Sequence, residues 1–287
     1  MVRWSRLALG MRALARRQWT GIAVLACVAG AIGIARSSPP QEDLPNRKQL
    51  VQQAKAAQYS LLREGMESVH CTATVDWRGF LNWRGPQDDD EKATLAALEK
   101  SHYDVSIDDA GTPTVSTVEA PIPAAADSAS EVRGTLAGLH RSIAGLLNAW
   151  TGYMAIAMLP RDEDDFHMTE TGGKYYLKYT VEDVAIAIAM DSKFQLLRVW
   201  TKDKSMRSDV HPTFDATPKG FVLNGYQADL DDLEKNRSTQ AKLTIQYETV
   251  DGLLVPQTMT ETVPGQRGPD TVHFSFSDYK ITKRGVR

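Results

Sequence analysis

The chain has 287 residues, of which 42% are hydrophobic and 24% charged, which is globular composition with enough chain for one large or two small cores. Its net charge of −3 shows no excess of lysine and arginine, and such an excess is what binding nucleic acid requires. Only Cys71 lies outside the N-terminal segment described next, so the sequence excludes a disulfide-stapled fold.

Residues 1–35 predict export across a membrane. Five arginines come first, no acidic residue precedes Glu42, and residues 18–35 form an uncharged run that ends in small residues. A basic stretch followed by an apolar stretch and a small-residue cleavage site is an export signal, here with cleavage after Ala35. Removing five arginines from a chain of charge −3 leaves −8, which argues further against a nucleic-acid partner.

The same segment has alternative interpretations. The uncharged run of 18–35 is near the lower length limit of a transmembrane helix, so it could stay as an N-terminal membrane anchor. The sequence before Cys27 resembles a lipoprotein box, and Arg16-Arg17 resembles part of a twin-arginine signal, although both matches are incomplete. Whether residues 1–35 are a cleaved signal or an uncleaved anchor, the rest of the chain crosses the membrane, because the arginines stay on the inner side. The rest of the chain then lies in the periplasm or is held at the membrane.

A single α+β domain is expected at residues 46–287, after a polar, proline-bearing tether at 36–45. Asn46 can cap a helix that Gly65 would end. Residues 69–77 alternate apolar and polar, which predicts a half-buried strand with Cys71 on its apolar side, as a small core residue.

The next elements are a short helix at 91–100 and a hairpin whose turn is at 109–111. Residues 119–130 are low in complexity and predict a surface loop. Residues 132–150 then place apolar side chains at steps of three and four, which predicts a long helix. Three glycines weaken that helix, so we expect it to pack against a sheet.

From Phe166 onward almost every segment predicts a strand, and the short connections favour an antiparallel meander. Residues 184–190 alternate alanine with larger apolar residues and have no polar face. We therefore expect both faces of this strand to be covered, with the long helix on one of them.

The sequence contains no nucleophile elbow, P-loop, dinucleotide fingerprint or zinc-ligand spacing, and its acidic runs lack the spaced ligands of an EF-hand. No histidine stands four residues from another or in a cysteine cluster. We therefore assign no catalytic residue, cofactor site or metal site, and we expect a protein that is not an enzyme. A hydrolase is the less favoured alternative.

The C-terminal strands resemble those of the bacterial outer-membrane lipoprotein-sorting carriers. The shared features are Tyr247, the turn at Asp251-Gly252, the Leu-Val-Pro step ending at Pro256, and a final strand that ends near Asp278-Tyr279. The resemblance covers roughly residues 174–281. It implies a curled antiparallel sheet, an open half-barrel, with helices that cover the concave face over an apolar cavity. No functional residue of the family can be assigned to a position here.

The resemblance makes a lipid or a lipoprotein acyl chain a plausible ligand for an exported or membrane-tethered envelope protein. The alternative is a scaffold or protein-interaction module whose core is filled. We expect residues 247–281 to form the closing edge of the sheet, with Phe274 inward and His273 outward. The candidate cavity-lining residues are Leu139, Ile143, Leu146, Trp150, Ile186, Ile188, Val199 and Phe274.

Overall fold

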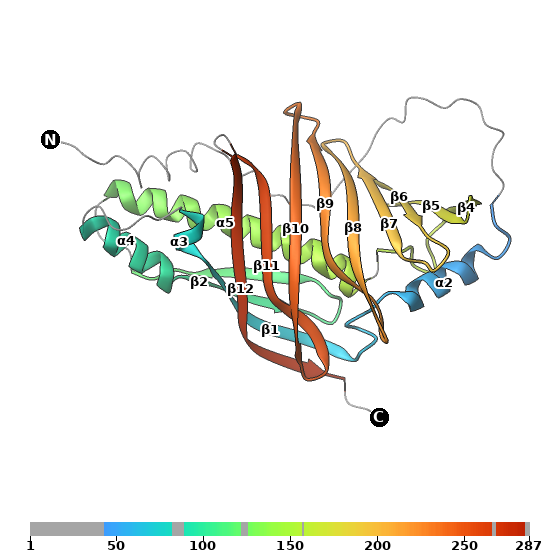
Figure 1. The fold of residues 1–287 in the computed structure, drawn as a ribbon, viewed down its shortest axis with the longest axis horizontal. Helices are drawn as coiled ribbons and strands as arrows, with labels where there is room; N and C mark the ends of the chain where they lie inside the picture. Colours follow the sequence, from blue (N-terminus) through green and yellow to red (C-terminus); the bar gives the residue numbers. More distant parts are fainter. Residues whose placement is uncertain (1–42, 82–88, 122–125, 157, 266–267, 285–287) are drawn as a thin grey trace.

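The computed structural model describes residues 43–81, 89–121, 126–156, 158–265 and 268–284 (Figure 1). Its helices are α2 (Arg47–Ala57), α3 (Trp77–Phe80), α4 (Asp89–Lys100) and α5 (Ala126–Met154). Its strands are β1 (Met66–Val75), β2 (His102–Ile107), β3 (Pro113–Val118), β4 (Phe166–Thr171), β5 (Lys174–Val181), β6 (Val184–Met190), β7 (Leu196–Lys202), β8 (Met206–Thr217), β9 (Gly220–Asp232), β10 (Arg237–Val250), β11 (Leu253–Gly265) and β12 (Gly268–Lys283).

All twelve strands belong to one curled, unclosed antiparallel sheet, in the order β3-β2-β1-β12-β11-β10-β9-β8-β7-β6-β5-β4. Strands β4 to β12 follow one another in both the chain and the sheet, so the predicted meander is confirmed. Tight turns with positive φ at Glu182, Asn236 and Asp251 join several of these strands, and such turns leave no room for parallel crossovers.

The last strand does not form the closing edge of the sheet, and that expectation is wrong. β12 pairs with β11 on one side and with β1 on the other, where Val75 lies opposite Phe274. The edges are β3 and β4. The expected direction of the side chains is confirmed, because Val272, Phe274 and Phe276 are buried whereas His273 is exposed.

The ends of two helices differ from the prediction. α2 ends at Ala57, well before Gly65, because Gln58 is extended and Tyr59 N donates a hydrogen bond to Phe221 O at 2.9 Å. α5 begins at Ala126, inside the expected surface loop at 119–130, and continues to Met154. The low-complexity composition of residues 119–130 predicted a loop, although several of these residues can form part of a helix.

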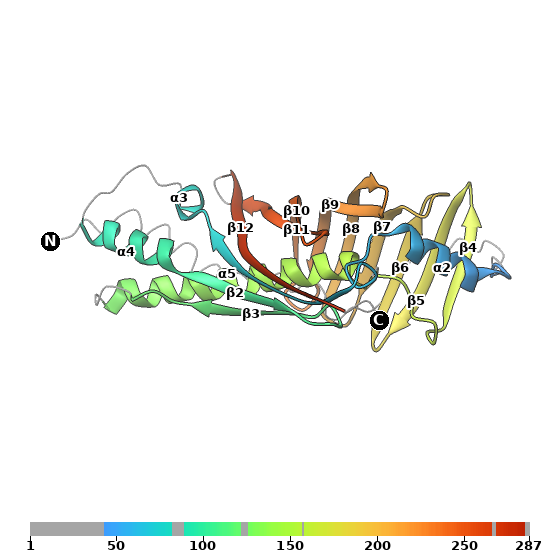
Figure 2. The ribbon, with the colours of Figure 1, turned by 90° about the horizontal axis from the view of Figure 1, so that it is seen from below.

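The helix α5 lies along the hairpin of β2 and β3 and runs on toward β8 and β9 (Figures 1 and 2). Its main contacts are with β3 and β9, and the ring of Tyr153 near its end lies 6.1 Å from that of Phe214 on β8. Its apolar stripe therefore packs on the sheet, as the glycines in this helix led us to expect.

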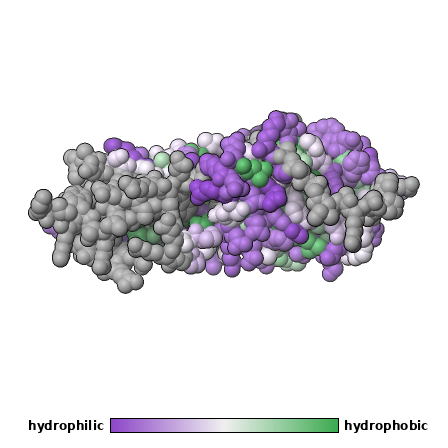
Figure 3. All heavy atoms as spheres, turned by 90° about the horizontal axis from the view of Figure 1, so that it is seen from above, coloured by the Kyte–Doolittle hydropathy of each residue, from purple (hydrophilic) through white to green (hydrophobic). Residues whose placement is uncertain are grey.

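The expectation of a transmembrane helix is contradicted, because no helix in the described part of the chain is both long and apolar enough to cross a membrane. The segment 18–35, for which that helix was expected, lies outside the described residues, as do most of the tether and the cleavage site after Ala35. Seen from above, the described surface is mainly hydrophilic, and its hydrophobic residues form small, separate areas (Figure 3).

Candidate functional site

The eight residues predicted to line a cavity all belong to one packed core or its margin. On α5, Leu139, Ile143, Leu146 and Trp150 are 2%, 0%, 1% and 0% exposed, respectively. On the sheet, Ile188, Val199 and Phe274 are almost as fully buried, and Ile186 is half-buried at the margin. At exposures this low, water cannot reach the buried side chains, so in this structure they pack against other residues.

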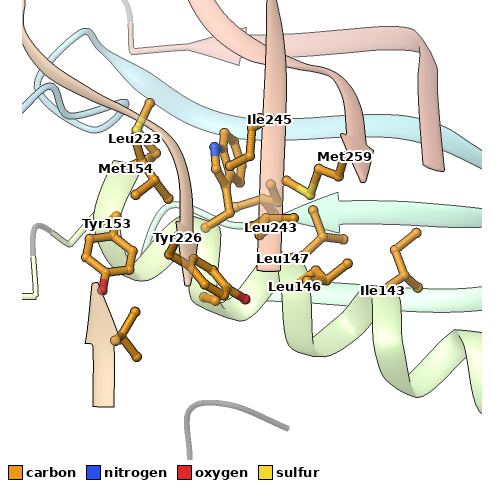
Figure 4. Close-up of a cluster of buried hydrophobic side chains, with 14 of the residues drawn as sticks. Ile143, Leu146, Leu147, Tyr153, Met154, Leu223, Tyr226, Leu243, Ile245 and Met259 are labelled. Atoms are coloured by element: carbon orange, nitrogen blue, oxygen red, sulfur yellow. The ribbon is translucent and has the colours of Figure 1, made fainter. Parts of the chain in front are cut away.

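The contacts of α5 are made chiefly away from β6 and β7. Figure 4 shows Ile143, Leu146 and Leu147 of α5 beside Leu243 of β10 and Met259 of β11. Ile186, Ile188 and Val199 lie farther along the sheet, where Tyr179 OH of β5 donates to Met158 O at 2.9 Å. The predicted residues thus share a core, but α5 does not cover the part of the core at β6 and β7.

Hydrogen bonds fix α5 to the sheet at two levels. Near its C-terminal end, Trp150 Nε1 donates to Tyr247 OH at 2.9 Å, and Tyr247 OH donates to Leu223 O at 2.6 Å. Farther toward its N-terminus, Tyr103 OH donates to Leu136 O at 3.1 Å. Buried tyrosine and tryptophan polar atoms normally find such partners, and these bonds set the position of the helix on the sheet.

A single carboxyl group lies beneath α5. Glu261 of β11 is 2% exposed, and burial raises its pKa to about 7, although the nearby Ser142 hydroxyl of α5 lowers the pKa in part. Among the described residues, neither Glu261 Oε2 nor Ser142 Oγ has a hydrogen-bond partner of normal geometry. An incompletely paired buried acid is costly in its charged form, so protonation of Glu261 should stabilise the packing of α5.

A groove lies on the opposite face of the sheet. Successive residues of a strand point to opposite faces, so Leu177, Ile188 and Val199, which are paired across β5 to β7, face the core. The neighbouring row, Lys178, Ala187 and Trp200, then faces away from it. Small alanine side chains on β6, between larger residues on β5 and β7, leave the floor of this face low.

The groove has a volume of about 1530 Å³. Its lining residues come chiefly from the outward rows of β5 to β10, with one contribution each from β4 and β11: His167, Tyr176, Lys178, Thr180, Ala185, Ala187, Trp200, Lys202, Arg207, Asp209, Asp229, Asp231, Ser238, Gln240 and Pro264. Seven residues of the inward rows also border it, including two of the predicted cavity residues: Leu177, Tyr179, Ile186, Ile188, Thr201, Ser208 and Thr239. A second depression of about 770 Å³ shares Asp229, Gln240 and Pro264 with it and extends toward β11 and β12. Together they form a long open groove across the sheet.

Ion pairs organise the middle of the groove. Arg198 Nε donates to Asp209 Oδ1 at 2.7 Å, and the Arg198 guanidinium lies 4.4 Å from the ring centre of Trp200. Arg207 Nε donates to Asp231 Oδ2 at 2.7 Å. The hydrogen bond from Arg198 lowers the pKa of Asp209, and those from Ser238 and Arg207 lower the pKa of Asp231. Both carboxylates are therefore ionised and neutralised by neighbouring arginines at neutral pH.

The residues with reactive side chains are placed in structural roles. Burial raises the pKa of Cys71 to about 12, so its thiol is unreactive, as its place on an apolar strand face suggested. His140 lies at the edge of α5, with Nδ1 3.1 Å from Thr117 Oγ1. No group of three or more histidine, cysteine, aspartate or glutamate side chains that could hold a metal ion occurs within the described ranges.

Sequence reasoning did not predict the groove. Its signal was present in the alternation of residues 184–190, but we expected the alanine face to be covered. In the structure Ala185 is exposed, Ala187 is half-buried and only Ala189 is buried. Comparisons with protein-family models, with curated proteins and with solved structures give no significant match, so the site is interpreted from its own geometry.

Proposed function

We propose that this chain is a non-catalytic binding protein of the bacterial cell envelope, which holds an apolar ligand such as an acyl chain in the groove across β5 to β10. The observation that carries the proposal is a volume of about 1530 Å³ with an alanine floor and aromatic walls. Pockets for small ligands are typically about 300–1,000 Å³ and mostly apolar, so this groove suits a longer, flexible ligand.

Two features of the sequence agree with this proposal. The basic and apolar segment at 1–35 favours export, and the C-terminal strands resemble those of the lipoprotein-sorting carriers. In those carriers the helices cover the concave face over the cavity. We propose a different arrangement here, in which α5 and α2 shield the packed face and the ligand uses the open one.

Filling the groove should block binding without unfolding the protein. Ala187→Trp places a large side chain on the groove floor, and we expect it to weaken binding of a fluorescent fatty acid on the order of tenfold or more. Ala137, an exposed alanine of α5, provides a control, because Ala137→Trp makes the same change outside the groove. Fluorescence titration and thermal unfolding of both variants provide the two measurements.

The parent protein is tested first for acyl-chain binding. Mass spectrometry of an organic extract should show co-purifying lipid, and the protein should take up the fluorescent fatty acid. A lipid-free extract together with no uptake would reject acyl-chain binding. Normal uptake by the Ala187→Trp variant would instead reject the groove as the site and direct attention to the face under α5.

A scaffold or protein-interaction module is the second candidate, and the packing of α5 favours it. Leu139, Ile143 and Leu146 are at most 2% exposed, so the space beneath α5 is filled, and the sheet ends in two edge strands that are six residues long. An edge strand can pair with an extended segment of another protein. A photo-crosslinker at Thr169 of the edge strand β4 tests this, and capture of one envelope protein without lipid uptake would favour it.

A further inference from the structure

The charges in the groove are unevenly paired. Asp209 and Asp231 are neutralised by Arg198 and Arg207, as described above. Lys178 of β5 and Lys202 of β7 also line the groove, yet within the described part of the chain neither ammonium group has an ion pair or a hydrogen bond. This end of the groove therefore carries two unneutralised positive charges.

Strand β6 brings these two lysines within reach of one ligand. Lys178 is opposite Ala187, and Lys202 is opposite Ala185, so the lysines flank β6 from its two sides. With strands about 4.8 Å apart and residues about 3.4 Å apart along each strand, their Cα atoms are roughly 12 Å apart. Because lysine has a long, flexible stem, both ammonium groups can approach one anion above the alanine floor.

The other end of the groove has the opposite character. Asp229 of β9 lies there, and its side chain accepts a hydrogen bond from the neutral amide of Gln240 at 2.8 Å. Among the described residues no cationic group forms an ion pair with Asp229, although Arg198 is near enough to interact with it electrostatically. An anionic group is therefore attracted to the β5–β7 end and repelled from the β9–β10 end. Beside the lysines, Ala187 of β6 and Trp200 of β7 are paired across the two strands and offer an apolar surface.

We propose that the groove selects an anionic amphiphile with a single acyl chain, whose carboxylate lies between Lys178 and Lys202 and whose chain runs along Ala187 and Trp200. This inference rests on the proposed function and specifies the ligand of the same groove. A long-chain fatty acid has both required parts, since its charge matches the lysine pair and its chain matches the apolar floor.

The test compares two ligands of equal chain length that differ in charge. Decanoate and 1-decanol, both below the concentration at which they aggregate, are titrated into the purified protein by calorimetry. We expect decanoate to bind on the order of tenfold more tightly, and added salt should reduce that advantage because it screens the lysine pair. In the double variant Lys178→Gln/Lys202→Gln, decanoate should bind no better than 1-decanol.

The matched control is Lys280→Gln/Lys283→Gln, which makes the same change in net charge at two exposed lysines of β12. It should bind both ligands as the parent does. Equal affinity of the parent for the two ligands would overturn the carboxylate assignment and leave acyl-chain binding in place. Failure of the parent to bind either ligand would overturn the proposed function itself. If both double variants lost affinity for decanoate equally, the loss would come from the change in net charge of the protein. That result would overturn the site at Lys178 and Lys202.

Discussion

Replacing Leu146 with alanine is expected to lower the free energy of unfolding by about 2–5 kcal/mol. Leu146 is 1% exposed and lies between α5 and the strands that carry Leu243 and Met259 (Figure 4). Truncating a packed leucine loses both its burial and the contacts of the atoms around the new cavity. Urea unfolding at neutral pH, followed by circular dichroism, measures the change.

Leu233→Ala provides the matched control for Leu146→Ala. Leu233 is 41% exposed, so the same truncation there should change stability by no more than about 0.5 kcal/mol. A loss at Leu146 as small as that at Leu233 would contradict a packed interior. It would mean instead that the space beneath α5 is open in solution, which favours the cavity expected from the sequence.

Replacing Glu261 with glutamine is expected to remove a loss of stability that the parent protein shows as the pH rises. The pKa of this carboxyl group is raised from its ordinary value of 4.5 to about 7 in the folded protein. Between these values the folded state binds more protons than the unfolded state, so the stability falls with increasing pH. The contribution is fully present below pH 4.5 and lost above pH 7, and it amounts to about 3 kcal/mol.

The measurement is the free energy of unfolding in urea at pH 5 and pH 8. The parent should be less stable at pH 8, whereas Glu261→Gln should have a flatter profile, since the glutamine side chain does not ionise. Glu234→Gln removes an exposed carboxylate and should keep the profile of the parent. Parallel profiles for the parent and Glu261→Gln would show that this acid is not the group that titrates.

The sequence predicted the strands well because most of them alternate buried and solvated residues. The alternation around Phe274 identified both the strand and its buried side. It did not predict that β1 would pair with β12, because alternation describes the faces of a strand and says nothing about its neighbours. The pairing that made β12 an interior strand depends on contacts between residues that are far apart in the chain.

The candidate site was predictable only in part for a similar reason. Periodicity identified Leu146 and Trp150 as apolar positions on one helix face, but a packed stripe and a cavity-lining stripe have the same spacing. The groove could not be predicted from periodicity, because Lys178, Ala187 and Trp200 come from three strands. They lie side by side only because of the register of the sheet. The burial of Glu261 was also not predicted, although alternation places Glu261 on the same strand face as Met259, because glutamate side chains are rarely buried.

The pairing of β1 with β12 has a consequence for how the molecule folds. The meander from β4 to β11 can form from neighbouring hairpins, but β1 to β3 join it only through β12, which lies far along the chain from β1. Contacts between residues so far apart in the chain must overcome a large loop-closure entropy, and folds rich in them form slowly. The joining of β1 to β3 with the meander is therefore expected to be a late and slow step of folding, which begins only once β12 is available to pair with β1.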